Sequence, residues 1–289
     1  MTYLYNRRVS FFNKIVKQFK HKKLHDLLVV HKIDKEIYKK LQKSAREYLA
    51  ISKINNLVNM TPNGRLAPKK ENQIAFNNFA QAYFQMIKSL KIQKYLKNYI
   101  IPVIRYKGGK IDQSNKKNNS RSELPHSDTW AGWTENCLLF FLPLAGDVLR
   151  NNVKFFKLPK NIKSSWFKRQ SFADASKKFG NKFSQIKPHY KLGYIYIADI
   201  SLPHVTIREK NAKSRLSVDS ALQFKTIKTR SSHKYLTAYI SSKENFIPIS
   251  KADLINKEYY LKCNYKMGEF EIVKGKEFRP VYNLSKKYK

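Results

Sequence analysis

Hydrophobic side chains follow two different periods along the chain. In the first hundred residues they recur every three or four positions between lysines and other polar residues, as in segment 11–19, and this spacing predicts amphipathic helices. Asp34 is the expected N-cap of a second helix that runs to about Met60, and a third helix is expected at 71–98. From Ile100 onward, short alternating or continuous apolar runs separated by turn residues are typical of a β-sandwich.

Residues 100–225 are expected to form the core of the protein. Six runs predict strands, at 101–106, 137–144, 153–158, 192–198, 204–208 and 216–224. Two antiparallel sheets built from such runs make a double-stranded β-helix, the cupin-like jelly roll with a tapered cavity. The sequence therefore predicts an α+β fold in three parts, which are a helical region packed on the core (1–99), the β-helix core (100–225) and a Lys/Tyr-rich C-terminal extension (226–289).

Two of these parts allow more than one interpretation. The basic amphipathic segment 11–19 could lie on a membrane surface or pack against the sheet, and packing is the favoured interpretation. The C-terminal extension contains candidate strands at 259–261 and 270–273. Its role as a β appendage, a dimer arm or a membrane-surface element is left open.

The composition predicts a globular chain. Its hydrophobic share is 42%, with 18 Phe and 18 Tyr, which is ample for a packed core and unlike a disordered basic protein. The longest apolar stretch is interrupted by Pro143 and falls far short of the roughly twenty residues that cross a bilayer. With only two cysteines and no apolar leader segment, a disulfide framework is not expected, and we expect the reducing cytoplasm.

The net charge of +38 comes from 58 basic and 20 acidic residues. An AT-rich genome explains many lysines, but it would also enrich glutamate, so selection for a positive potential is plausible. Such a field attracts phosphorylated substrates, polyanions or anionic lipid surfaces. Because the basic residues are spread widely, we expect an anionic or sugar-linked small molecule as partner and no nucleic acid. Peripheral association with the anionic inner face of the membrane is the alternative, and the oligomeric state is left open.

Candidate chemistry is concentrated in two short motifs and one histidine between them. His126 and Asp128 form an H-x-D motif, His204 follows far downstream, and Arg215 and Ser217 form an R-x-S motif eleven positions later. Two imidazoles and one carboxylate make the facial triad that suits non-haem Fe(II), because it leaves one face of the metal open. An arginine fork clamps a dicarboxylate bidentately. We expect the H-x-D pair to share one face of a strand, with the opposing strand supplying the second histidine.

These motifs, with the strand that runs from Gly193 to the second histidine, resemble the Fe(II)/2-oxoglutarate-dependent oxygenase superfamily over about residues 100–225. The resemblance implies Fe(II) and 2-oxoglutarate as cofactors and O2 as co-substrate. It further implies that His126, Asp128 and His204 are the catalytic iron ligands. Arg215 would pair with the distal carboxylate of 2-oxoglutarate, and Ser217 would hydrogen-bond the same group.

Within that superfamily, segments 126–132 and 138–144 look like the oxygenases of sporadic carbohydrate biosynthesis clusters. Asp128 stands where the related halogenases have a small residue, so hydroxylation is favoured. The nucleic-acid demethylases have a second arginine where this chain has Ala221. The resemblance thus implies hydroxylation of an unactivated C–H bond in a carbohydrate-type or phosphorylated anionic small molecule. The candidate substrate contacts are Trp130, Arg105 and Arg121.

Simpler interpretations remain beside this one. Lone histidines more often pack or cap than bind metal, Trp130 could be ordinary core, and Arg215 could simply pair with Asp219 or Asp199. At the level of function, the alternative is a catalytically silent jelly-roll module that binds polyanions or an anionic membrane surface.

Overall fold

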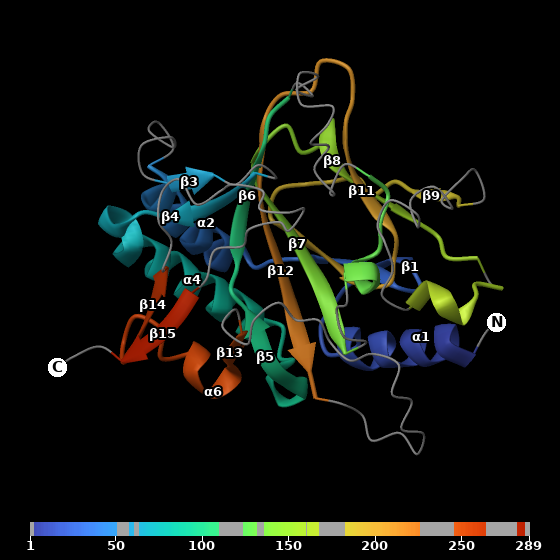
Figure 1. Cartoon of the computed structure of the whole chain (residues 1–289), viewed down its shortest axis with the longest axis horizontal. Helices are drawn as coiled ribbons and strands as arrows, with labels where there is room; N and C mark the ends of the chain where they lie inside the picture. The colour runs from blue at the N-terminus through green and yellow to red at the C-terminus, as the bar shows by residue number, and fades with distance from the viewer. Residues whose placement is uncertain are drawn as a thin grey trace, which may run out of the picture.

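The computed structural model describes residues 3–50, 58–60, 64–109, 124–131, 136–159, 161–167, 183–225, 246–263 and 282–286 (Figure 1). Its α-helices are α1 (Tyr3–Val16), α2 (Lys35–Leu49), α4 (Gln73–Ser89) and the short α6 (Ile249–Ala252). Single turns of 3-10 helix are η2 (Lys70–Asn72), η3 (Gln93–Tyr95), η6 (Asp128–Ala131) and η7 (Ser164–Phe167).

Antiparallel strands form two facing sheets and a separate pair. The main sheet has the order β1-β2-β10-β7-β12-β6-β4-β3, with β5 pairing β12 and β13. Its strands are β1 (Lys22–His25), β2 (Leu28–Lys32), β3 (Val58–Met60), β4 (Arg65–Pro68), β5 (Leu96–Ile100), β6 (Val103–Lys107), β7 (Cys137–Gly146), β10 (Tyr194–Asp199), β12 (Arg215–Phe224) and β13 (Phe246–Pro248). The second sheet is β11-β8-β9, made of β11 (His204–Arg208), β8 (Asn151–Phe156) and β9 (Gln185–Ile186). The separate pair is β14 (Tyr259–Cys263) and β15 (Tyr282–Lys286).

The order of these strands confirms the double-stranded β-helix. From β6 onward the chain passes repeatedly between the sheets: β7 is in the main sheet, β8 and β9 are in the second, β10 returns to the main sheet, β11 to the second and β12 to the main sheet. A bridge between His126 and His204 adds the segment before β7 to the edge of the second sheet. This alternation is the connectivity of a jelly roll, in which two sheets enclose one interior.

The helices cover the outer face of the main sheet. The hydroxyl of Tyr38 in α2 donates to Pro143 O in β7 at 3.0 Å, and Tyr83 in α4 is hydrogen-bonded to Ser220 in β12. The apolar side of α1 is buried, with Phe12 fully inaccessible. The packed interpretation of the first amphipathic segment is therefore confirmed. Among the described helices, none is both long and apolar enough to cross a bilayer.

The ends of the helices differ from the sequence-based expectation. Asp34 caps α2 as predicted, its Oδ1 accepting from Glu36 N at 2.9 Å and Ile37 N at 3.1 Å. The helix ends at Leu49, however, where Ala50 turns into the left-handed region, and residues 58–60 form strand β3. The prediction that helix 71–98 is continuous was also wrong, because the chain leaves α4 after Ser89 and enters β5.

The N-terminal hundred residues also hold strands that the pattern did not predict. Strand β2 pairs with β10, and β4 pairs with β6, so this region extends the main sheet at both sides. These strands are short and lack an alternating pattern long enough to be seen from sequence. The three-part division of the chain stays a prediction. The candidate strand at 259–261 corresponds to β14, whereas 270–273 lies outside the described residues.

Candidate active site

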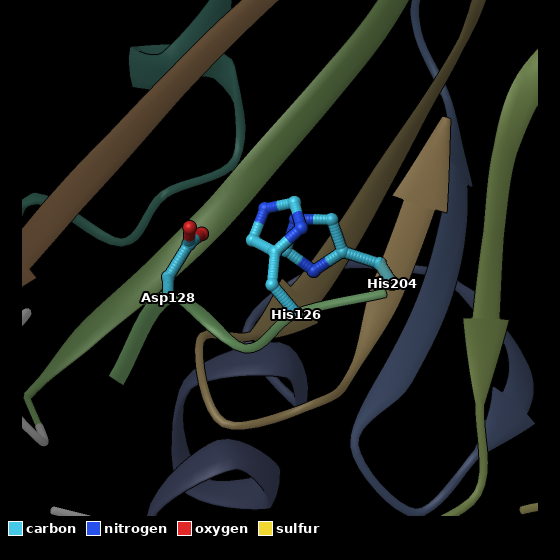
Figure 2. A group of neighbouring side chains, drawn as sticks. All are labelled: His126, Asp128 and His204. Atoms are coloured by element: carbon cyan, nitrogen blue, oxygen red, sulfur yellow. The ribbon is translucent and has the colours of Figure 1, made fainter. Parts of the chain in front are cut away.

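The two candidate histidines meet at the edge of the second sheet. His126 N donates to His204 O at 2.9 Å, and His204 N donates to His126 O at 2.8 Å, so each backbone holds the other. The candidate ligand atoms of His126, Asp128 and His204 all lie within 4.8 Å of one another, and their side chains rise toward the same region (Figure 2). The structure thus brings together three residues that are separated by up to 78 positions.

The expected strand face for the H-x-D pair was wrong in one respect. His126 forms the β-bridge, but Asp128 is the first residue of η6 and does not belong to a strand. Its backbone N–H donates to Ile200 O at 3.1 Å, which ties the start of this turn to the loop before β11. The carboxylate of Asp128 is therefore directed toward the imidazole rings by a tight turn and not by the strand that was predicted.

Backbone carbonyls orient both imidazole rings. His126 Nδ1 lies 2.7 Å from Leu124 O, and His204 Nδ1 lies 3.1 Å from Leu202 O. When Nδ1–H donates to a carbonyl, the other ring nitrogen, Nε2, carries the lone pair that a metal needs. The rings lie 4.4 Å apart between centroids at an interplanar angle of 55°. Both imidazoles are thus set in the tautomer of a metal ligand.

Burial keeps His126 neutral. The loss of solvation lowers the pKa of His126 well below its usual 6.5, and positive charge on His204, Arg105 and Lys107 acts in the same direction. Neutral imidazole is the form that binds a metal, and no proton has to leave first. The effect of Arg105 and Lys107 also shows that two cations of β6 lie near this ring.

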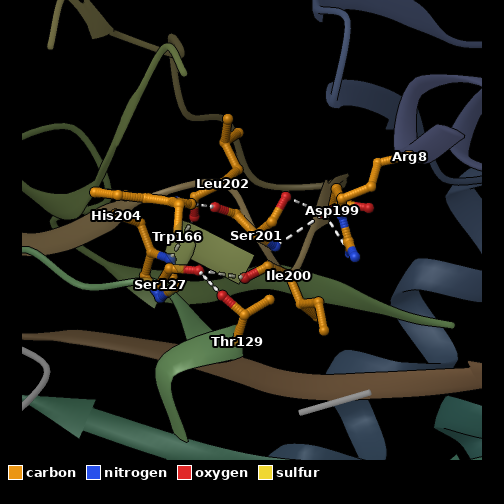
Figure 3. A network of polar contacts seen from close by, with 9 residues as sticks. All are labelled: Arg8, Ser127, Thr129, Trp166, Asp199, Ile200, Ser201, Leu202 and His204. Carbon is orange, nitrogen blue, oxygen red and sulfur yellow. Dashed lines mark hydrogen bonds and ion pairs between the residues drawn. The ribbon is translucent and has the colours of Figure 1, made fainter. Parts of the chain in front are cut away.

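A polar network behind the histidines fixes the loop before β11 (Figure 3). Ser127 Oγ donates to Ile200 O at 3.1 Å and is bonded to Thr129 Oγ1 at 2.7 Å. Asp199 Oδ1 accepts from the N–H and the hydroxyl of Ser201 at 2.8 and 2.5 Å. Because the loop is hydrogen-bonded at each of these points, the positions of the H-x-D motif and of His204 depend on it.

An arginine from the N-terminal helix completes this network. Arg8 Nε donates to Asp199 Oδ1 at 2.7 Å, and Arg8 Nη2 lies 2.6 Å from the same oxygen. Both side chains are almost fully buried, with 6% and 0% of their surface exposed. Sequence analysis missed Arg8, because no local pattern links residues that are 191 positions apart.

Arg215 occupies a second buried position, inside the jelly roll. It is 1% exposed, its Nη1 donates to Asn151 O at 3.1 Å, and its guanidinium lies 5.1 Å from the centroid of the Phe141 ring. Its Nε has no hydrogen-bond partner among the described residues. Burial, opposed by the charge of Asp219, lowers the pKa of Arg215 to about 10.

The simple ion-pair interpretation of Arg215 does not hold. Asp199, one proposed partner, is paired with Arg8, and Asp219, the other, lies 2.5 Å from Arg105 Nε. Ser217 Oγ donates to Asp219 Oδ1 at 3.4 Å and lies on the same face of β12 as Arg215. Arg215 and Ser217 therefore face the interior. The carboxylates of Asp199 and Asp219, the two partners suggested for Arg215, are paired with other arginines.

The register of the strands adds cations that the sequence analysis did not select. Lys107 lies opposite Arg215 on β6, and Arg65 lies opposite Arg105 on β4. Arg208 follows His204 at an even interval on β11, and its charge acts on Arg215. Arg105 lay on the predicted strand 101–106, but that strand was predicted to end one residue before Lys107, and β4 itself was not predicted.

The other two candidate substrate contacts, besides Arg105, are Trp130 and Arg121. Trp130 is 1% exposed, its Nε1 donates to Trp166 O at 3.0 Å, and the two indoles meet edge to face. Trp130 therefore packs in the core, which was the alternative to a substrate contact. A substrate contact by Trp130 stays a prediction. Arg121 lies outside the described residues.

Comparison with solved structures finds chains of similar fold. The alpha ketoglutarate dependent epimerase SnoN from nogalamycin biosynthesis is 12% identical over 75% of this chain and 84% of that chain, with a TM-score of 0.44. EctD from S. alaskensis is 14% identical over 75% and 76%, with a TM-score of 0.44. SnoN has been solved with Fe3+, alpha ketoglutarate and nogalamycin RO, and EctD with 2-oxoglutarate and 5-hydroxyectoine.

With TM-scores below 0.5, the fold assignment depends on the strand order described above and not on these similarities. No protein-family model matches the chain, and no curated protein matches it.

The residues present fit both implied groups. For the metal, two imidazoles and a carboxylate converge within 4.8 Å, which is a donor set suited to Fe(II). For the keto acid, the buried guanidinium of Arg215 has an Nε donor that no described group satisfies. An unsatisfied buried donor is costly, and a carboxylate on this face would remove the cost.

Proposed function

We propose that the protein is an Fe(II)/2-oxoglutarate-dependent dioxygenase. One observation carries this proposal: a 2-His-1-carboxylate cluster lies at the edge of the second sheet of a jelly roll that also contains a buried arginine without a carboxylate partner among the described residues. Either feature alone has a simpler explanation. Together they match the two groups that such an enzyme must hold, a ferrous ion and a dicarboxylate.

His126, Asp128 and His204 would hold the metal, and Arg215 would bind the far carboxylate of 2-oxoglutarate with help from Ser217. Lys107, directly opposite Arg215, adds a second positive charge at that end. Bound iron and 2-oxoglutarate supply the oxidising power for C–H hydroxylation with O2. The chain itself keeps His126 neutral, orients both imidazoles through Nδ1 and offers the keto acid a buried guanidinium.

For the substrate, we propose an anionic or sugar-linked small molecule that is hydroxylated at an unactivated C–H bond. The anionic part is supported by the cations that the strand register brings together: Lys107 lies opposite Arg215, Arg65 lies opposite Arg105, and the charge of Arg208 acts on Arg215. The carbohydrate part depends only on the resemblance of segments 126–132 and 138–144.

The decisive experiment measures iron retention and the conversion of 2-oxoglutarate to succinate, with a panel of sugar phosphates as substrates. Wild-type protein should bind about one Fe(II) and release succinate. Asp128→Ala should lose both, because two imidazoles alone do not hold Fe(II) firmly. Asp253→Ala is the matched control, since Asp253 is an exposed acid of the α6 region paired with Lys88, and it should behave as wild type.

A different pattern would favour the silent binding module. If wild-type protein retains no iron and releases no succinate, yet binds phosphate-bearing vesicles or polyanions with a steep salt dependence, the oxygenase proposal fails. Iron binding that survives Asp128→Ala would equally contradict the ligand set.

A further inference from the structure

The short loop between β10 and β11 contacts two of the three candidate metal ligands through its own carbonyl groups. Ile200 O accepts from the backbone N–H of Asp128 at 3.1 Å. Leu202 O lies 3.1 Å from the ring nitrogen Nδ1 of His204 (Figure 3). One loop therefore sets the backbone of one ligand and the ring of another, and a shift of this loop would move both.

The conformation of the loop depends on Asp199, the last residue of β10. Asp199 Oδ1 accepts from the N–H and the hydroxyl of Ser201, and Asp199 O accepts from Leu202 N at 3.0 Å. An aspartate that bonds the backbone two residues further on closes a tight turn. Residues 199–202 are at most 1% exposed, so water does not compete for these bonds. The carboxylate thus fixes the direction in which the loop carbonyls point.

Arg8 of helix α1 contacts this turn and also a second part of the site. Its Nε and Nη2 lie 2.7 and 2.6 Å from Asp199 Oδ1. Its guanidinium carbon lies 5.8 Å from the centroid of the Phe167 ring in η7. The neighbouring residue of η7, Trp166, accepts from Trp130 Nε1 in η6, the turn of the H-x-D motif. Arg8 is therefore connected to both segments that carry the candidate ligands.

Stability is a weak explanation for burying this ion pair. Removing two charges from water costs free energy that their attraction only partly returns, and apolar residues of similar size often stabilise a core equally well. A guanidinium and a carboxylate do, however, fix the distance and direction between two segments more narrowly than apolar side chains do. The pair of Arg8 and Asp199 has this effect at the loop that orients the candidate ligands.

We propose that Arg8 and Asp199 are positioning residues for the metal ligands, which makes helix α1 a functional part of the metal site. They act through the loop before β11 and through η7. The inference rests on the proposed function, because it needs a metal at His126, Asp128 and His204. Since coupling between two events is reciprocal, a metal that binds the ordered loop also stabilises the docking of α1.

The test is an anaerobic titration of the full chain with Co(II), whose visible absorption depends on the number and geometry of its ligands. Arg8→Met should weaken Co(II) binding roughly tenfold, as expected when a group that orients metal ligands is lost, and should change the absorption of the bound ion. Arg8→Lys should retain part of the affinity, because it keeps the charge and loses the fork. The affinity of the metal-saturated variants for 2-oxoglutarate should equal that of the wild type, because Arg215 is unchanged.

Two further variants separate positioning from a loss of stability. Asn77→Ala removes a fully buried side chain of α4 that is hydrogen-bonded to the backbone of Leu261. This variant should unfold more easily and bind Co(II) as the wild type does. The double variant Arg8→Met, Asp199→Asn buries no unpaired charge and should regain stability. Its Co(II) affinity should stay low, because α1 no longer holds the loop.

Hydrogen exchange tests the reciprocal effect without a measurement of activity. Saturation of the wild type with Co(II) should slow amide exchange in α1, and the same addition should have little effect on α1 in Arg8→Met. The amides of α4 are the internal reference, since α4 has no part in the proposed coupling.

Equal Co(II) affinity in the wild type, Arg8→Met and the double variant overturns the inference and leaves the oxygenase proposal intact. Recovery of Co(II) affinity together with stability in the double variant also overturns it, because the effect of Arg8 would then be one of stability alone. If the wild type binds neither Co(II) nor Fe(II), the oxygenase proposal itself fails, and the positioning role fails with it.

Discussion

Arg8 and Arg215 are both buried arginines beside the candidate active site, and they differ in what surrounds the guanidinium. Arg8 is 5% exposed and makes two contacts of 2.6–2.7 Å with the Asp199 carboxylate. Arg215 is 1% exposed, bonded to one backbone carbonyl, and leaves its Nε without a partner among the described residues. One charge is neutralised within the fold, and the other is not.

Under the proposed function, this difference is the one expected between a structural charge and a ligand-binding charge. Burying a charge is costly unless it is paired, so the proposed function has the carboxylate of 2-oxoglutarate pair with the buried guanidinium of Arg215. Burial lowers the pKa of Arg215 to about 10, which corresponds to a cost of a few kcal/mol in the ligand-free protein. Arg8 instead joins helix α1 to the loop that carries His204.

The largest effect that tests this comparison is on the affinity for 2-oxoglutarate. Replacing Arg215 by Met should weaken binding of 2-oxoglutarate by roughly a hundredfold or more, because removing one partner of a buried charged pair costs about 2–5 kcal/mol. Arg215→Lys should retain part of the affinity. The measurement is a titration of the Mn(II)-loaded protein, and an unchanged dissociation constant would place the keto acid elsewhere.

Arg8→Met should lower the free energy of unfolding. The affinity of the folded variant for 2-oxoglutarate should stay close to that of the wild type. The variant leaves the Asp199 carboxylate buried without its cation, at an expected cost of about 3–5 kcal/mol. Urea unfolding of metal-free protein measures this. The double variant Arg8→Met, Asp199→Asn should recover much of the loss, because the buried charge is gone while the amide oxygen still accepts from Ser201. A purely additive double variant would show that the pair is not coupled.

Stability of the ligand-free protein should move in the opposite direction when Arg215 is replaced. Arg215→Met removes an uncompensated buried charge and should raise the free energy of unfolding by about 1–3 kcal/mol. The same urea experiment tests it, beside Arg8→Met as the matched change. If both variants are equally destabilised, Arg215 is a structural residue and the contrast between the two arginines is lost.

The smallest effect concerns acid stability. Because the folded pKa of His126 lies well below the 6.5 of the unfolded chain, the unfolded state binds the extra proton between these values. Stability of the metal-free protein should therefore be fully present above about pH 6.5 and fall as the pH drops below it, by at most about 1.4 kcal/mol per pH unit. His126→Asn should flatten this slope in unfolding curves recorded from pH 7 to pH 5. An equal slope in the variant would assign the acid sensitivity to other groups.

Local periods in the sequence predicted the elements of the core and the chemical type of the site. Strand 204–208 was predicted with its observed limits, and the Asp34 cap was found where the pattern indicated. These features depend on neighbours within a few residues, so they are readable without the fold. The helix predictions ran too far because apolar spacing alone does not show where tertiary packing converts a segment into a strand.

The order of residues along the chain determined the kind of ligands available: an H-x-D pair, a later histidine and an R-x-S motif. Only the tertiary structure decided which charges meet. In the folded protein, Arg8 pairs with Asp199 and Arg105 pairs with Asp219. Arg65 lies opposite Arg105, and the Nε of Arg215 has no hydrogen-bond partner among the described residues. Partner choice depends on distance and burial between segments far apart in sequence, and no local pattern of side chains encodes either quantity.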